Sequence, residues 1–350
     1  MTRIGLLVNP AAGRGRAGTA GPIVLAELRA AGHDVVDLTE PDVTSARRRA
    51  AAFLHDRPVD APAALVGVGG DGVANLAVNA ILTHAPHVPF GLVPAGTGND
   101  TARSLRLPLR DPVAAVARLL GALTRDPRRI DVGEITAVRD GDAPVAPGDD
   151  PDDGAPVTRR YFVNVVSAGI DAAVNARANR IGWPKGPSRY VVALAAELVG
   201  FRGFDVRVVA DGRDLGPAGT LVAVANSRSI GGGMAIAPDA DWSDGLFDVV
   251  TAPTIPRRTL VRIFPRVYGG THVTHPVVSV VRAREVLLLP GSGGDGRSGR
   301  SGRSTGSTGS TGSAGRRAAA PAPLVHADGE PVGDVPLRLR LVAEALRVLA

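Results

Sequence analysis

Short apolar runs alternate with segments of helical periodicity along the first part of the chain. Such runs are typical of strands buried on both faces, and their alternation with helices predicts a parallel sheet covered by helices. Asp111 can cap a helix whose first residue is Pro112. The expected strands are IGLLVNP, HDVVDLT, AALVGVG and PFGLVPA, and the expected helices are 19–31, 44–55, 73–83 and 112–123.

Beyond this region the pattern changes to apolar strands with few helices between them. Leucines alternate with arginines over Leu337–Leu341, which predicts a strand with one face in solvent. We therefore predict an α/β plus β fold, with a parallel α/β domain at residues 1–130 and an antiparallel β-sandwich at 131–350. The expected elements of the second domain are strands at YFVNVVSAGI, FDVRVVA, TLVAVANS, GLFDVVTA, REVLLLP and PLRLRLV, and a helix at 188–200.

Two segments cannot bury a core, and both are predicted to be disordered inserts. Residues 139–157 hold six Asp and one Arg among Pro and Gly. Residues 291–320 hold five Arg and one Asp among Gly, Ser and Thr. The five arginines could recruit the protein to an anionic membrane, since each basic residue near such a leaflet is worth about 1 kcal/mol. The alternatives are a linker without a role and a basic insert whose charge is masked by pairing with the acidic 139–157 insert.

Composition and charge narrow the classes of function. The chain has no cysteine, which excludes disulfides, thiolate zinc sites and a cysteine nucleophile. The first apolar run is too short for a signal peptide, and no stretch is long enough to span a membrane. We therefore expect a cytoplasmic protein whose membrane contact is peripheral. The net charge of +6 suits an anionic partner, but basic and aromatic residues are not interleaved, so nucleic acid is not expected.

The strongest local signal is a buried strand that ends in Gly69, Gly70, Asp71 and Gly72 and leads into a helix. Bare glycines let the backbone approach phosphate oxygens, and a helix N-terminus favours negative charge. A carboxylate beside phosphates makes sense mainly if it holds Mg²⁺ or its water shell. The motif is neither a Walker A loop nor a dinucleotide fingerprint, and by itself an ordinary turn is an equal alternative.

The neighbouring strands end in similar loops. PAGTGND carries Gly96, Thr97 and Asp100 to the carboxyl edge of the sheet, where ligands of open α/β sheets bind. NPAAGRGRAG, after the first strand, holds Asn9, which can fix the turn, and Arg14, which can meet phosphate charge. Together the loops predict a phosphate site with a cation.

Seven motifs occur in an order that resembles the diacylglycerol kinase catalytic family, which includes soluble bacterial diacylglycerol kinases and sphingosine kinases. They are NPAAGRGRAG, GGDGVANLAVNAI, GLVPAGTGNDTARSL, IDVG, YFVNVVSAGIDA, AIAPDADWSDGLFDVV and HADGEPV. The resemblance covers nearly the whole chain apart from the two inserts. It implies a nucleotide-binding α/β domain, a β-sandwich domain, and an active site in the cleft between them.

The resemblance also implies roles for single residues. Asp71 would organise Mg²⁺ and the phosphates of ATP, and Asp100 and Asp131 would join a Mg²⁺–water network. Asp328 in HADGEP matches the catalytic base, with Glu330 as its neighbour, and a carboxylate can accept the proton of a lipid hydroxyl. The implied nucleotide contacts are Asn9, Thr39, Gly70, Asn75 and Thr97, to which the loop chemistry adds Arg14, Gly69, Gly72 and Gly96.

A structural metal site in some relatives is matched by Asp244 and the carbonyls of Asp241 and Leu246. Oxygen ligands on a turn suit Mg²⁺ or Ca²⁺, and an Asp-rich turn without metal is the alternative. Asp241 stands where close relatives commonly have lysine, so different salt bridges are expected there.

Three positions depart from the family pattern, namely Val73, Leu76 and Thr101, and none removes a proposed acid. We expect an ATP-dependent lipid kinase that uses an Asp base and Mg²⁺, with diacylglycerol converted to phosphatidic acid. The alternatives are an NAD kinase-like enzyme and a catalytically weak nucleotide- or lipid-binding module. The expected partners are a membrane lipid and an anionic membrane surface, and a homodimer is left open.

Overall fold

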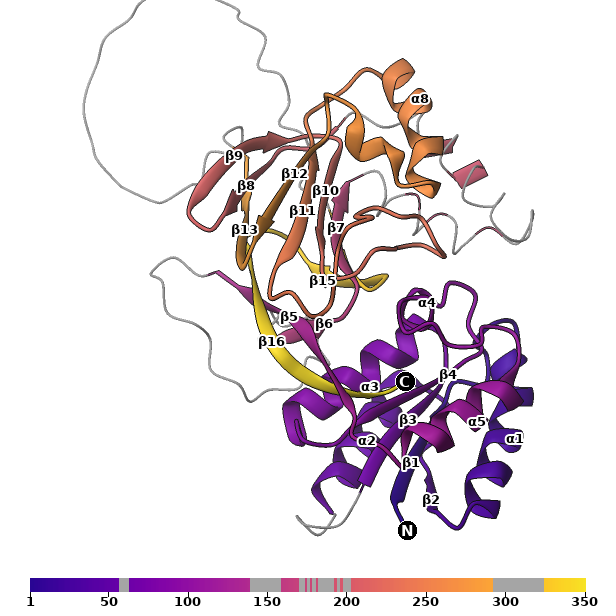
Figure 1. The fold of residues 1–350 in the computed structure, drawn as a ribbon. Helices are drawn as coiled ribbons and strands as arrows, with labels where there is room; N and C mark the ends of the chain where they lie inside the picture. The colour runs from indigo at the N-terminus through magenta and orange to yellow at the C-terminus, as the bar shows by residue number, and fades with distance from the viewer. Residues whose placement is uncertain are drawn as a thin grey trace, which may run out of the picture.

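A computed structural model describes residues 1–56, 63–138, 159–169, 203–291 and 324–350, together with a few isolated positions between 170 and 202. Most of the helix predicted at 188–200 and nearly all of both predicted inserts lie outside the described residues. Figure 1 shows two lobes, with the N-terminal α/β domain below and the strand-rich domain above.

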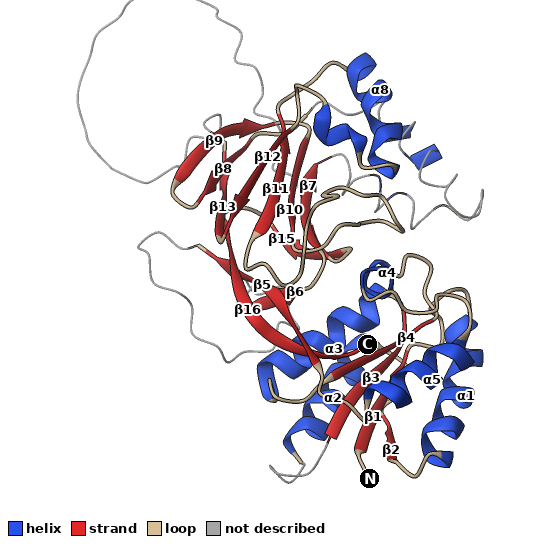
Figure 2. Ribbon diagram, viewed as in Figure 1, coloured by secondary structure: helices blue, strands red, loops and turns tan. Residues whose placement is uncertain are grey.

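The lower domain is the predicted parallel sheet. Its strands lie side by side in the order β2-β1-β3-β4, and every residue of β3 and β4 is buried. One face is covered by α1 and α5, and the other by α2 and α3 (Figure 2). The bounds are β1 (Arg3–Val8), α1 (Arg16–Ala30), β2 (Asp34–Asp37), α2 (Val43–His55), β3 (Ala63–Gly69), α3 (Asp71–His84), β4 (Phe90–Pro94), α4 (Asp100–Ser104) and α5 (Pro112–Ala122).

Two helices, α2 and α5, begin at side-chain caps. The Asp111 carboxylate accepts a hydrogen bond of 2.9 Å from the Ala114 amide, and Pro112 is the first residue of α5. This confirms the predicted cap. Asp42 caps α2 in the same way, through a bond of 2.8 Å from the Ser45 amide.

The upper domain is the predicted antiparallel sandwich. One sheet has the order β12-β11-β10-β7-β14-β15, and the facing sheet contains β16, β13, β8 and β9, with β5 beside β16 and β6 beside β5. The core between the two sheets includes the stacked rings of Phe162 and Phe247, whose centroids are 5.6 Å apart. The bounds are β5 (Arg128–Ala137), β6 (Arg160–Phe162), β7 (Val165–Gly169), β8 (Val206–Ala210), β9 (Arg213–Ala218), β10 (Leu221–Ala225), β11 (Phe247–Ala252), β12 (Ser279–Ala283), β13 (Glu285–Pro290), β14 (Val325–Ala327), β15 (Glu330–Gly333) and β16 (Leu337–Leu349).

The outer face of the β10–β11 sheet is covered by α8 (Arg257–Tyr268), which is followed by a short 3₁₀ helix, η1 (Thr271–Thr274). The pattern analysis did not predict α8. Its buried residues Leu260, Ile263, Phe264 and Val267 follow the spacing of an amphipathic helix, so the signal was present in the sequence. Because α8 covers this face, β10 and β11 are buried on both sides.

Two strands join the lobes. β5 leads out of the α/β domain, so the predicted boundary at residues 130–131 falls inside this strand. β16 runs back beside β5, and its end pairs with β4 in parallel, with Val348 opposite Phe90. The C-terminal residues of the chain therefore complete the sheet of the first domain, which the sequence pattern did not predict.

We expect Leu346→Ala to destabilise the protein by about 2–5 kcal/mol, because Leu346 is fully buried where β16 joins the α/β core. Ala343→Ser is the matched control, since Ala343 is exposed on the same strand and its change should stay within about 0.5 kcal/mol. Urea unfolding measures both. Equal stability of the two variants would show that the end of β16 contributes no packing.

Candidate functional site

A polar cavity of about 170 Å³ lies between the two domains. The α/β domain contributes the loops after β3 and β4, and the sandwich contributes the β14–β15 turn and the loop after β10. The lining side chains include four carboxylates that the sequence analysis singled out, Asp71, Asp100, Asp328 and Glu330, together with Thr97. The structure thus brings the predicted acids of both domains to one place.

The glycines of the two loops allow close backbone packing. A Cβ atom on Gly96 would lie 2.3 Å from the Cα of Gly70, which no real side chain tolerates. The Gly69 carbonyl accepts hydrogen bonds from the amides of Ala95 and Gly96 at 2.7 and 3.0 Å. Gly69, Gly70 and Gly96 therefore hold the loops together, whereas Gly72 lines the cavity itself.

Asp71 is the first residue of α3, and Thr101 fixes its carboxylate. The Thr101 amide and hydroxyl donate to Asp71 Oδ1 at 2.9 and 3.1 Å. The same hydroxyl accepts a bond of 2.8 Å from the side-chain amide of Asn164 in the sandwich domain. Thr101, which the sequence analysis treated only as a departure from the family pattern, links the acid to the second domain.

Asp100 is buried beside Asp71. Its two oxygens accept bonds of 2.7 and 2.8 Å from the amides of Gly232 and Gly233, on the loop of the opposite domain. Burial, with the nearby Asp71 charge as a further cause, raises the pKa of Asp100 to about 6. A Cβ on Gly98 would lie 2.9 Å from Asp71 Oδ2 and 3.6 Å from Asp100 Oδ2, so both carboxylates flank this glycine.

A buried carboxylate whose ionisation is opposed by a second carboxylate in a polar cavity suits a divalent cation. Within the described ranges no cluster of three or more Asp, Glu, His or Cys side chains is arranged for a metal. A Mg²⁺ ion at this pair would therefore complete its coordination with water and phosphate oxygens, as Mg²⁺ commonly does.

Asp328 lies at the turn between β14 and β15 with a positive φ of 51°. Oδ1 accepts bonds from the amides of Asn164 and Val165 at 2.8 and 3.2 Å. Oδ2 accepts bonds from the Val163 amide at 2.9 Å and the Asn75 side chain at 3.2 Å. Burial raises the pKa of Asp328 to about 6, although these bonds oppose the rise.

Helix α3 also holds the sandwich through two asparagines one turn apart. Asn79 donates to the Tyr161 carbonyl at 2.9 Å and accepts from the Tyr161 amide at 2.8 Å. It also donates to Asn75 Oδ1 at 3.2 Å. Asn75, predicted to contact nucleotide, is thus placed at the proposed base. Sequence reasoning missed Asn79, whose signal was a second amide on the same helix face.

The remaining predicted nucleotide contacts lie outside the cavity wall. Asn9 Oδ1 accepts a bond of 3.1 Å from the Ala11 amide, which confirms that Asn9 fixes its turn. Arg14 is exposed, and the Thr39 amide donates to Asp37 at 2.9 Å. Their contacts with a nucleotide stay predictions.

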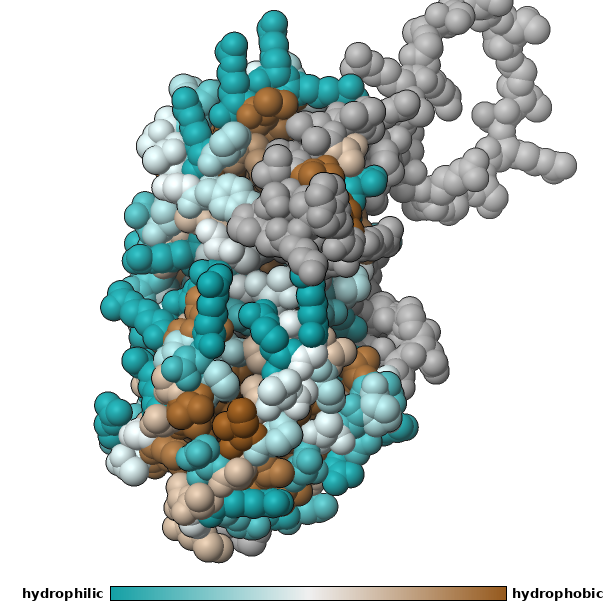
Figure 3. All heavy atoms as spheres, turned by 90° about the vertical axis from the view of Figure 1, so that its right-hand side faces the viewer, coloured by the Kyte–Doolittle hydropathy of each residue, from teal (hydrophilic) through white to brown (hydrophobic). Residues whose placement is uncertain are grey.

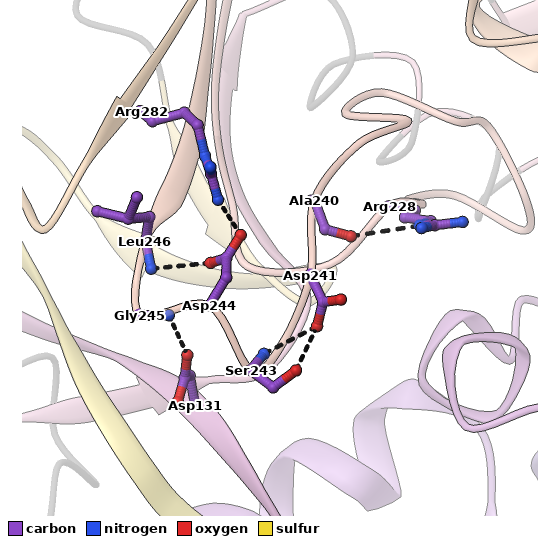
Figure 4. Close-up of polar contacts among 9 residues, drawn as sticks. All are labelled: Asp131, Arg228, Ala240, Asp241, Ser243, Asp244, Gly245, Leu246 and Arg282. Carbon is purple, nitrogen blue, oxygen red and sulfur yellow. Dashed lines mark hydrogen bonds and ion pairs between the residues drawn. The ribbon is translucent and has the colours of Figure 1, made fainter.

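Asp131 also lies outside this cavity. Its carboxylate accepts a bond of 2.8 Å from the Gly245 amide (Figure 4) and another of 2.8 Å from the Glu344 amide. It therefore fastens the 241–246 turn to β16 at the junction of the domains. Both oxygens have backbone partners here, and a part in the Mg²⁺ network stays a prediction.

The residues matched to a structural metal site gather on the turn drawn in Figure 4, with an arginine beside them. Asp244 Oδ1 accepts from the Leu246 amide at 3.0 Å, and Oδ2 pairs with the Arg282 guanidinium. Asp241 Oδ1 accepts from the Ser243 amide and hydroxyl at 2.9 and 2.7 Å. Because Arg282 already neutralises Asp244, the side chains as they stand do not fit a divalent ion.

A second, apolar cavity of about 40 Å³ lies under α8. Its walls come from β10, β11, the loop after β10 and the inner face of α8. Ile230 lines both this cavity and the polar one. The apolar and the polar cavity thus meet at Ile230. Within the described ranges, no helix has the length and apolar composition that crossing a bilayer requires.

Comparison with known proteins agrees with this architecture. Residues 3–135 match the family described as the diacylglycerol kinase catalytic domain, and residues 164–308 match the YegS C-terminal NAD kinase beta sandwich-like domain. The chain is 37% identical over 285 residues to a diacylglycerol kinase of Mycobacterium tuberculosis, covering 81% of this chain and 84% of that protein. It is 23% identical over 290 residues to the diacylglycerol kinase of Bacillus subtilis, covering 82% and 85%.

The fold is similar to the crystal structure of a diacylglycerol kinase from Bacillus anthracis, with a TM-score of 0.62 at 16% identity over 99% of this chain and 96% of that one. The similarity spans both domains, as does the match to the mycobacterial protein. The chain therefore belongs to the diacylglycerol kinase catalytic family and is a kinase.

Proposed function

We propose that this kinase transfers the γ-phosphoryl group of ATP to the hydroxyl of a membrane lipid of the diacylglycerol type. The observation that carries the proposal is the pair of adjoining cavities. One holds the carboxylates of Asp71, Asp100 and Asp328, and the other is apolar, with Ile230 between them. A lipid needs both, since its hydroxyl must reach the acids while its tail leaves water.

The nucleotide phosphates are proposed to lie at the N-terminus of α3, where Gly72 and Thr97 line the cavity. The helix N-terminus favours the phosphate charge. Mg²⁺ at Asp71 and Asp100 would supply charge neutralisation for the transferred group. Asp100 needs this cation, because burial beside Asp71 makes its ionised form costly.

Asp328 is proposed to accept the proton of the lipid hydroxyl as the oxygen attacks the γ-phosphorus. The new bond joins the lipid oxygen to phosphorus, the bond to the β–γ bridging oxygen breaks, and ADP leaves with that electron pair. The amides of Val163, Asn164 and Val165 hold the carboxylate in place. A base with a pKa near the working pH is well suited to this transfer.

An NAD kinase-like activity is the competing proposal, since the sandwich domain matches a family with that likeness. The apolar cavity that meets the polar one at Ile230 favours a lipid. The deciding experiment supplies labelled ATP with a total lipid extract in one assay and with NAD in another. Label in an extractable lipid supports the proposal, and label in NAD alone contradicts it.

Asp71→Ala should lower turnover about 10²–10³-fold, because the phosphates lose a charge-stabilising partner. Circular dichroism should show an intact fold. Asp126→Ala is the matched control, since Asp126 is an exposed carboxylate of the same domain and its loss should leave turnover unchanged. Wild-type turnover in a folded Asp71→Ala protein would contradict the assignment of Asp71.

Asp328→Asn keeps the shape of the side chain and removes the proton acceptor. We expect turnover to fall about 10²–10⁴-fold, with ATP affinity by calorimetry nearly unchanged. A parallel collapse of ATP affinity would instead identify Asp328 as a nucleotide-binding residue.

Turnover should fall as the pH drops through about 6, because Asp328 must be ionised to accept a proton. Stability should respond in the opposite sense. The folded pKa values of Asp100 and Asp328 are raised, so their contribution to stability is fully present below about 3.9, the ordinary pKa of an aspartate, and is lost as the pH rises through 6.

Asn75→Ala removes a donor that lowers the pKa of Asp328, so the acid limb of kcat/KM should move to higher pH. An unmoved limb with a raised KM for ATP would favour the predicted nucleotide contact of Asn75.

A further inference from the structure

Helix α8 has two chemically different faces. Its inner face supplies Leu260, Ile263, Phe264 and Val267 to the wall of the apolar cavity. Its outer face carries the arginines at 257, 258, 262 and 266, all exposed. The helix that closes the proposed tail cavity is therefore also a basic surface element.

The charge around α8 is of one sign. Residues 249–284 contain no Asp or Glu and include six arginines. Six ion pairs join arginines to acids in the described part of the chain, and all six involve other arginines. Within that part, no carboxylate oxygen lies within 4 Å of the guanidinium nitrogens of Arg258, Arg262 or Arg266. A surface with several exposed guanidinium groups and no neighbouring carboxylate in sequence attracts an anionic partner.

Large apolar side chains lie among these arginines. Val261 is 53% exposed and Tyr268 is 37% exposed, and both are on α8. Figure 3 shows hydrophilic side chains projecting at the top of the molecule with a small hydrophobic area between them. Basic residues mixed with exposed apolar ones on one amphipathic helix are typical of helices that lie in a membrane interface.

We propose that the outer face of α8 docks on an anionic lipid bilayer, with Arg258, Arg262 and Arg266 at the headgroup phosphates and Val261 and Tyr268 entering the interface. The inference rests on the proposed lipid substrate, because it explains how a tail reaches a cavity lying directly beneath the docked helix. A bilayer fits better than nucleic acid or an acidic protein, since neither of those uses the apolar space behind the helix.

The test compares two triple variants of the full chain with equal changes of net charge. One is Arg258→Gln, Arg262→Gln and Arg266→Gln on α8. The other, the control, is Arg110→Gln, Arg118→Gln and Arg125→Gln on the exposed surface of the α/β domain. Binding is measured by sedimentation with phosphatidylglycerol–phosphatidylcholine vesicles at two salt concentrations. Each basic residue near an anionic leaflet contributes roughly a fivefold factor, so the α8 variant should bind about 100-fold more weakly.

The control variant should bind vesicles like the wild type, and Val261→Asp alone should weaken binding on the same vesicles. Circular dichroism checks that each variant is folded. Equal losses in the two triple variants, or no loss in the α8 variant, would overturn the proposal. Unchanged vesicle binding with lost binding to a nucleic acid or an acidic peptide would also overturn it.

Activity on detergent-dispersed lipid separates this inference from the proposed function. The α8 variant should keep its turnover there, because its inner face and the acids are untouched. If the wild-type protein bound vesicles through α8 but phosphorylated no lipid, the docking surface would stand and the proposed function would fail. If lipid were phosphorylated but the α8 arginines had no effect on vesicle binding, only the docking surface would fail.

Discussion

The cavity depends on hydrogen bonds that cross from one domain to the other. Asp100 of the α/β domain is held by the Gly232 and Gly233 amides of the sandwich, and Asp328 of the sandwich is held in part by Asn75 of α3. Buried carboxylates are costly unless donors surround them. Each domain therefore supplies donors that the acid of the other requires, and the cavity exists only when the domains are together.

The same arrangement leaves the acids with raised pKa values, since burial outweighs the hydrogen bonds at both Asp100 and Asp328. Burying these carboxylates lowers the stability of the folded protein, and functional sites commonly carry such a cost. With pKa values of about 6 both acids are mostly ionised at neutral pH, at a greater cost to the folded protein than an ordinary aspartate, and the ionised forms are the ones that can attract a cation or accept a proton. A cation and nucleotide that bind only the folded protein would stabilise this cleft.

The strands, helices and acidic loops of the α/β domain could be predicted because apolar periodicity and turn chemistry are local. The sequence could not show that the end of β16 completes the first sheet, since strand pairing over 250 residues leaves no local mark. The sequence also could not show that Asn79 hydrogen-bonds the backbone of Tyr161, or that the amides of Gly232 and Gly233 hydrogen-bond Asp100. Such contacts depend on how two domains meet, which single-chain periodicity does not encode.

The acidic residues that were matched to the family by motif fall into two groups, according to the partners that surround each carboxylate. Asp71, Asp100 and Asp328 line one cavity, whereas the Asp131 carboxylate is satisfied by two backbone amides and Asp244 is paired with Arg282. Asp131 fixes the same turn that carries Asp244, next to the strands that join the domains. An arginine supplied by β12 can neutralise that turn without an ion from solution. The structure thus separates acids that can exchange protons or cations with a ligand from acids whose partners are already built into the chain.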